Sequence, residues 1–141
     1  MPRADVYRVM RQTFNSQQIL LVDDEPTVRD AIRILLQSDG HKVKTVSSGA
    51  EALEELDKSS YDFVFTDLNM EGMSGIQLAR AIKAKYPRQT IVMITAYTQV
   101  FYQQTQDRTL VDFIVGKPFT IRSIRDILVS NEEIPESPIS K

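Results

Sequence analysis

The alternation of apolar runs with amphipathic segments predicts most of the secondary structure of this chain. Four short runs are apolar almost throughout and are bounded by polar residues, at 19–22, 63–65, 91–94 and 113–116. Such runs are typical of strands that are buried on both faces of a parallel sheet. The segment 42–46 instead alternates lysine with valine or threonine. This alternation predicts a strand toward the edge of the sheet.

The segments between these strands show helical spacing of their apolar residues. Pro26 suits a first helical turn, the Ser47-Ser48 pair offers an N-cap, and a third helix begins at Ser74 or Gly75. Asp39-Gly40 ends the first helix, and the polar segment 98–108 is a weaker fourth helix. The predicted core faces comprise Val28, Ala31, Ile32 and Leu35, then Ala50, Leu53 and Leu56, then Ile76, Leu78, Ala79 and Ile82, and finally Ile121, Ile124, Ile127 and Leu128.

Five strands that alternate with five helices predict one α/β domain, with a parallel sheet covered on both faces. We place this domain at residues 18–130. Residues 1–17 form a basic N-terminal extension with weak helical spacing, and residues 131–141 are rich in proline, serine and glutamate. That composition favours a disordered tail. No second domain or internal repeat is predicted.

Composition excludes several functions. The 141 residues contain no cysteine, so thiolate metal sites and cysteine nucleophiles are absent. The net charge of −2 gives no reason to expect nucleic-acid binding. No apolar run approaches the roughly 18 residues of a membrane span, and no secretory signal is evident. We therefore expect a cytoplasmic protein with no membrane contact.

Chemistry gathers where the apolar strands end. The residues that follow the four runs are Asp23-Asp24, Asp67, Thr95 and Lys117. The carboxyl ends of parallel strands share one edge of the sheet, so these side chains are expected to converge. Taken singly, each is more often a structural or solvated residue, and the joint placement is what indicates a site.

Three close carboxylates repel one another unless a cation lies between them, and Mg²⁺ suits such an oxygen ligand set. Asp67 then stands as a nucleophile able to form an acyl phosphate. Mg²⁺ and Lys117 would neutralise the transferring phosphoryl group, while Thr95 would donate a hydrogen bond to it.

Five ordered motifs resemble the receiver domain of bacterial two-component response regulators. They are Leu21-Val22-Asp23-Asp24-Glu25-Pro26, Thr66-Asp67, Met73-Ser74-Gly75, Thr95-Ala96 and Lys117-Pro118-Phe119. The resemblance covers roughly residues 18–130. It implies a flavodoxin-like (βα)₅ fold with strand order 2-1-3-4-5, and a signalling domain that assists its own phosphorylation and dephosphorylation and is not an enzyme in the usual sense.

The resemblance also assigns roles to individual residues. Asp67 would be the phosphoacceptor; Asp24, Asp67 and the main-chain carbonyl of Asn69 would bind Mg²⁺, and Asp23 would hold the ion through water. The peptide bond between Lys117 and Pro118 would be cis. Asn69 and Tyr97 would border the approach of hydrolytic water, and Thr95 and Ile114 would occupy the switch positions.

The chain departs from the receiver pattern at three places. Glu71 stands where receivers usually have proline, which predicts a looser or differently turned loop after Asp67. Residues 109–112 replace a common Gly-Ala pair, and Ile114 stands where an aromatic residue is usual. Strand alternation predicts that Phe113 faces the opposite side from Ile114.

The expected phosphoryl donor is a sensor histidine kinase or a histidine phosphotransfer protein. The only histidine, His41, is predicted to be a surface turn residue at the edge opposite the acids, so it is not expected to be the donor. Kinase docking is expected beside the first helix, where Ile34 points away from the core. A downstream effector protein is also expected, and the sequence leaves room for a phosphorylation-dependent dimer.

Three alternative functions fit the sequence less well. A haloacid-dehalogenase-type phosphatase also combines an aspartate nucleophile with Mg²⁺, but places that aspartate after the first strand in an Asp-x-Asp pattern. A flavodoxin would need a phosphate-binding loop where this chain has Asp23-Asp24. A receiver that is never phosphorylated would not need the complete acidic set.

Overall fold

The computed structural model describes residues 16–96 and 109–133, which build a parallel five-stranded sheet. The strands are β1 (Gln18–Val22), β2 (Lys42–Val46), β3 (Phe63–Asp67), β4 (Thr90–Thr95) and β5 (Phe113–Gly116). Their order across the sheet is β2-β1-β3-β4-β5, which confirms the flavodoxin-like topology. The alternating strand β2 lies at one edge, as its pattern predicted.

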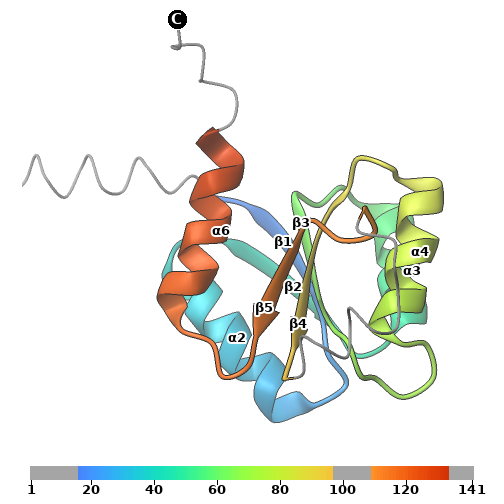
Figure 1. Ribbon diagram of the computed structural model, residues 1–141, viewed down its shortest axis with the longest axis horizontal. Coiled ribbons are helices and arrows are strands. Elements are labelled where there is room, and N and C mark those ends of the chain that lie inside the picture. The colour runs from blue at the N-terminus through green and yellow to red at the C-terminus, as the bar shows by residue number, and fades with distance from the viewer. Residues whose placement is uncertain (1–15, 97–108, 134–141) are drawn as a thin grey trace, which may run out of the picture.

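Helices cover both faces of this sheet (Figure 1). In the described part of the chain they are α2 (Pro26–Ser38), α3 (Gly49–Lys58), α4 (Gly75–Lys85) and α6 (Ile121–Glu133). Helices α2 and α6 lie on one face, while α3 and α4 lie on the other. Helix α6 runs three residues past the predicted domain boundary at residue 130. The predicted helix at 98–108 lies outside the described residues, as do residues 1–15 and 134–141.

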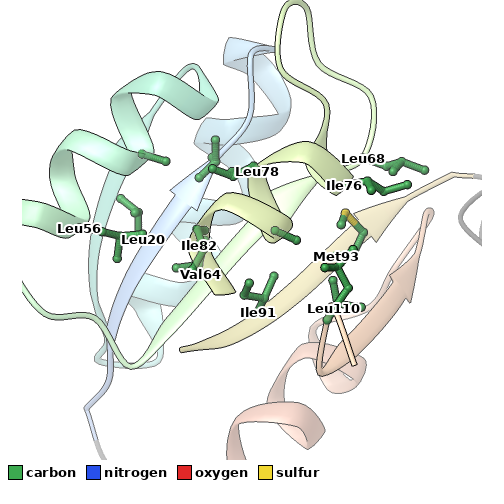
Figure 2. Close-up of a cluster of buried hydrophobic side chains, with 14 residues drawn as sticks. Leu20, Leu56, Val64, Leu68, Ile76, Leu78, Ile82, Ile91, Met93 and Leu110 are labelled. Atoms are coloured by element: carbon green, nitrogen blue, oxygen red, sulfur yellow. The ribbon is translucent and has the colours of Figure 1, made fainter. Parts of the chain in front are cut away.

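The hydrophobic core forms two layers because successive strand side chains point to opposite faces of the sheet. Toward α3 and α4 lie Leu20, Val64, Ile91 and Met93 with their helical partners (Figure 2). Toward α2 and α6 lie Ile19, Leu21, Phe63, Phe65, Val92 and Ile94. The strands are thus buried on both faces, which explains their continuous apolar runs.

Two alanines assigned to helix core faces are in fact exposed, namely Ala31 in α2 and Ala50 in α3. Helix α2 packs through Val28, Ile32 and Leu36, which recur every fourth residue, and Leu36 is completely buried. In α3 the buried alanine is Ala52. A side chain as small as alanine buries little apolar area at any position, so it marks the core stripe poorly.

The prediction that His41 is a surface residue is wrong. His41 is only 5% exposed, and its Nδ1 accepts a hydrogen bond of 3.0 Å from the main-chain N–H of Gln17. It precedes β2 and therefore lies at the edge of the sheet opposite the acidic residues, as predicted. The buried Nδ1 atom thus satisfies a main-chain donor just before β1 begins.

Serine caps fix the beginnings of α3 and α4. The Ser48 hydroxyl accepts from the N–H of Glu51, and Ser74 forms a reciprocal capping box with Gln77. Gly75, the first residue of α4, donates its N–H to the carbonyl of Leu68 over 2.8 Å. Together these contacts bind α4 closely to the end of β3, where Asp67 lies.

Candidate functional site

Three carboxylates meet at the carboxyl edge of the sheet. Oxygen atoms of Asp23, Asp24 and Asp67 all lie within 4.8 Å of one another. Val22 in β1 pairs with Thr66 in β3, so the residues that follow in each strand are neighbours. The predicted convergence of these acids is therefore present in the structure.

Asp23 is the most deeply buried of the three carboxylates, with 3% exposure. Its Oδ1 accepts a 2.9 Å hydrogen bond from the N–H of Glu25, and its main-chain carbonyl accepts one of 2.9 Å from Nη1 of Arg29. Burial raises the pKa of Asp23, the Glu25 N–H opposes that change, and the nearby charge of Asp67 adds to it. The contacts from Glu25 and Arg29 were not predicted, because a main-chain N–H has no signature in the sequence and Arg29 lies outside the motif.

Asp67 ends β3 and forms an ion pair with Lys117. The Lys117 Nζ lies 3.0 Å from Oδ1 of Asp67, and both side chains are largely shielded from solvent. Burial raises the pKa of Asp67, the Lys117 ammonium lowers it in turn, and the charge of Asp24 raises it further. One anionic oxygen thus already faces a cation placed to neutralise charge.

Thr95 and Lys117 reach the same edge from the next two strands. Thr95 ends β4 and is 1% exposed, and it directly follows Ile94, which pairs with Asp67. The N–H of Lys117 donates to the carbonyl of Thr95 over 2.8 Å. The Lys117–Pro118 peptide bond is cis, as the resemblance implied.

The loop from β3 to α4 contacts the acidic cluster through its main chain. The N–H of Glu71 donates to Oδ2 of Asp24 over 2.9 Å, although the two residues lie 47 positions apart. Gly72 follows with a φ of 79°, a conformation that glycine adopts at little cost. The prediction of a looser or differently turned loop stays a prediction. The hydrogen bond from Glu71 to the site is a separate finding, which no side-chain pattern could have revealed.

The remaining predicted positions lie in β5, in the loop after β3, or outside the described residues. Ile114 packs against the core layer of α3 and α4, beside Leu110 and Val111, whereas Phe113 packs against the opposite layer. The prediction from strand alternation is confirmed. Asn69 is exposed in the loop after β3. Tyr97 lies outside the described residues.

The donor set fits a hard divalent cation. Asp23, Asp24 and Asp67 offer only carboxylate oxygens, the ligands that Mg²⁺ prefers. A bound cation would also reduce the mutual repulsion that contributes to the raised pKa values of Asp23 and Asp67.

None of the described helices combines the length and apolar character of a membrane span.

Comparisons with known proteins agree with this architecture. The response regulator receiver domain family matches residues 19–129. Response regulator protein FleR of Pseudomonas aeruginosa is 33% identical over 125 residues, which cover 88% of this chain and 26% of FleR. The chain therefore spans about a quarter of the length of that relative.

Solved receiver structures have the same fold. The response regulator TrrA of Thermotoga maritima, in complex with Mg²⁺-BeF, has a TM-score of 0.71 at 32% identity, covering 79% of this chain and 96% of TrrA. TrrA has also been solved in complex with the histidine kinase ThkA; that structure has a TM-score of 0.72 at 32% identity and covers 79% of this chain and 95% of TrrA.

A CheY-like receiver domain from Methylobacillus flagellatus has a TM-score of 0.75 at 30% identity, covering 82% of this chain and 98% of that domain. The alternative of a phosphatase finds no support in these matches. The ordered motifs, the sheet topology and the family match over residues 19–129 lead to one conclusion: the chain belongs to the response regulator receiver domain family.

Proposed function

We propose that Asp67 accepts a phosphoryl group from the phosphohistidine of a partner protein, in the presence of Mg²⁺. The observation that carries this proposal is the gathering of three carboxylates within 4.8 Å, one of them paired with Lys117 at 3.0 Å. The Mg²⁺-BeF complex of TrrA supports it, since BeF mimics a phosphoryl group.

In the proposed transfer, an oxygen of Asp67 attacks phosphorus while the phosphorus–nitrogen bond of the donor breaks. The electron pair of that bond remains on the imidazole nitrogen. Asp24, Asp67 and the Asn69 carbonyl would hold Mg²⁺, with Asp23 acting through water, and the bound ion would supply charge neutralisation. The Lys117 ammonium turns from Asp67 toward one phosphoryl oxygen, and the Thr95 hydroxyl donates a hydrogen bond to another phosphoryl oxygen.

The donor is a sensor histidine kinase or a histidine phosphotransfer protein, and the domain itself catalyses no reaction on an external substrate. His41 supports this, because it is buried at the opposite edge of the sheet. The structure of TrrA with the kinase ThkA is a precedent for such a partner. The cytoplasmic location expected from the sequence stays a prediction.

The output of the switch also stays a prediction. Thr95 and Ile114 would transmit phosphorylation to a surface that binds an effector or a second copy of the chain, and amide exchange with and without beryllofluoride would test this. Asn69 and Tyr97 would control hydrolysis, which phosphate-release rates of the variants would test. Residues 18–130 are the unit proposed to carry these functions.

Intact-protein mass spectrometry tests the phosphoacceptor. After incubation with acetyl phosphate and Mg²⁺, the protein should gain the mass of one phosphoryl group, and Asp67→Asn should gain none. The matched control is Asp62→Asn, at the other end of β3, which should be phosphorylated normally. A full mass gain in Asp67→Asn would refute the assignment of the phosphoacceptor. Phosphorylation by ATP without a partner would instead refute the proposal that the donor is another protein.

A further inference from the structure

Asp24 is held by a loop that is remote from it in the sequence. Its carboxylate is exposed, whereas Asp23 is buried and Asp67 is largely shielded. Asp23 accepts from Glu25 and Asp67 accepts from Lys117, both within the motifs already described. For Asp24 the corresponding donor is the main-chain N–H of Glu71, 2.9 Å from Oδ2.

We propose that the Glu71 N–H is a positioning group that orients the Asp24 carboxylate for Mg²⁺ binding. This inference rests on the proposed function, in which Asp24 is a metal ligand. An exposed aspartate samples several rotamers, and fixing one of them costs conformational entropy. The hydrogen bond from Glu71 meets that cost before the cation arrives. Carboxylates that bind metals are commonly oriented by such outer hydrogen bonds.

The same bond sets the distance between two expected ligands. Asn69, whose carbonyl is expected to bind the cation, lies only two residues before Glu71. Holding the Glu71 N–H against Asp24 therefore holds this part of the loop beside the acidic cluster. The bond is charge-assisted, because its acceptor is an ionised carboxylate, and such bonds are stronger than neutral ones.

Neighbouring contacts keep the loop in this conformation. Gly72 turns the chain at a φ of 79°, directly after the donor. Met73 then packs over Gly49 at the start of α3, close enough that a Cβ at position 49 would lie 2.7 Å from its sulfur. Glu71 is thus presented by a loop that is anchored on its C-terminal side. Proline at position 71 would have no N–H to donate.

Two variants at position 71 separate the main chain from the side chain. Glu71→Pro removes both the N–H and the carboxylate, whereas Glu71→Ala removes only the carboxylate. We expect Glu71→Pro to bind Mg²⁺ about tenfold more weakly than Glu71→Ala, the lower end of the usual effect of losing an outer hydrogen bond at a metal site. The measurement is a Mg²⁺ titration followed by ¹H–¹⁵N correlation spectra, which also verify that each variant is folded.

A spectroscopic readout tests the bond itself in the wild-type chain. The Glu71 amide should be protected from hydrogen exchange, should lose this protection in Asp24→Ala, and should shift on Mg²⁺ addition with the same Kd as the acidic cluster. Equal Mg²⁺ affinities of Glu71→Pro and Glu71→Ala, tighter binding by Glu71→Pro, or an unprotected Glu71 amide would overturn the inference. Failure of the proposed function is distinguishable, because the wild type would then show no Mg²⁺ binding at this cluster.

Discussion

Asp23 illustrates how a single side chain can serve a site at the expense of stability. It is nearly inaccessible to solvent and lies within 4.8 Å of two other carboxylates. A buried anion is unfavourable unless it is paired, and the contacts that it receives in the absence of a cation only partly compensate. The burial that raises its pKa therefore lowers the stability of the metal-free domain at neutral pH.

Replacing Asp23 with asparagine should raise the free energy of unfolding of the metal-free domain at pH 7 by about 1 kcal/mol, the usual size of such a single-group effect. Asparagine keeps an oxygen that can accept from Glu25 but carries no charge. Because the pKa of Asp23 is raised in the folded state, its stabilising contribution is full below the ordinary value of 3.8 and is lost as pH rises through the folded value. The advantage of Asp23→Asn should therefore shrink as pH falls from 7 toward 4.

Urea unfolding without divalent cations measures this difference, and Mg²⁺ should stabilise the wild type more than the variant. Asp126→Asn is the control, since Asp126 is exposed on α6. A variant that is less stable than the wild type at pH 7, or a gain that persists at pH 4, would contradict the argument.

The connection between β3 and α4 requires a glycine at position 75 for steric reasons. Gly75 begins α4 where the helix approaches the backbone after Asp67. A Cβ at position 75 would lie 2.9 Å from Cα of Leu68 and would overlap the carbonyl oxygen of Asp67. Main-chain atoms cannot move aside as a flexible side chain can. The receiver motif Met73-Ser74-Gly75 thus has a direct steric meaning.

Gly75→Ala should lower the free energy of unfolding by about 2 kcal/mol, the middle of the range for overpacking a close contact. It should also weaken Mg²⁺ binding, because relief of the overlap displaces the backbone that carries Asp67. Gly49→Ala is the matched comparison: the three atoms nearest to its new Cβ all belong to the side chain of Met73, so its cost should be smaller. Thermal unfolding and Mg²⁺ titration of both variants test this prediction. If the two variants lost equal stability and equal Mg²⁺ affinity, the steric role of Gly75 would be contradicted.

Most elements of the sheet and its helices follow from local patterns. Strand β5 begins and ends at the predicted residues. The N-cap of α3 lies in the predicted Ser47-Ser48 pair, and α4 begins at Gly75, one of the two predicted starting residues. The burial of His41 and of Leu36 was not predicted, because each depends on which element packs above the residue. Strand alternation alone does not give the order β2-β1-β3-β4-β5, which came from the resemblance.

The candidate site was predictable at the level of side chains but not of the main chain. Five side chains of the site could be predicted because they come where buried strands end, namely Asp23, Asp24, Asp67, Thr95 and Lys117. The N–H groups of Glu25 and Glu71 carry no such signal, because every residue except proline has one. Their partners are fixed only when the loops are placed in three dimensions, 47 residues apart in the case of Asp24.

An exposed apolar side chain on α2 is the basis for a prediction of where a partner docks. Helix α2 begins beside the acidic cluster, and its residue Ile34 is 57% exposed while Val28, Ile32 and Leu36 face the core. A single exposed isoleucine is common on protein surfaces, so its place on the helix that begins beside the site is what makes it informative. We expect the phosphohistidine donor to bury Ile34.

Replacing Ile34 with aspartate should slow phosphoryl transfer from a cognate kinase or phosphotransfer protein about tenfold, the effect of losing one good interface contact. Transfer from acetyl phosphate should not change, because this small donor needs no docking surface and Ile34 does not touch the acidic cluster.

Ala50→Asp is the matched control, an exposed apolar residue on α3, which covers the opposite face of the sheet (Figure 1). It should leave both rates unchanged, so that a charge placed anywhere on the surface cannot account for the loss. Rates measured with the two donors separate docking from chemistry. Equal slowing with both donors would place the effect of Ile34→Asp in the site or the fold, and no slowing with the protein donor would remove α2 from the interface.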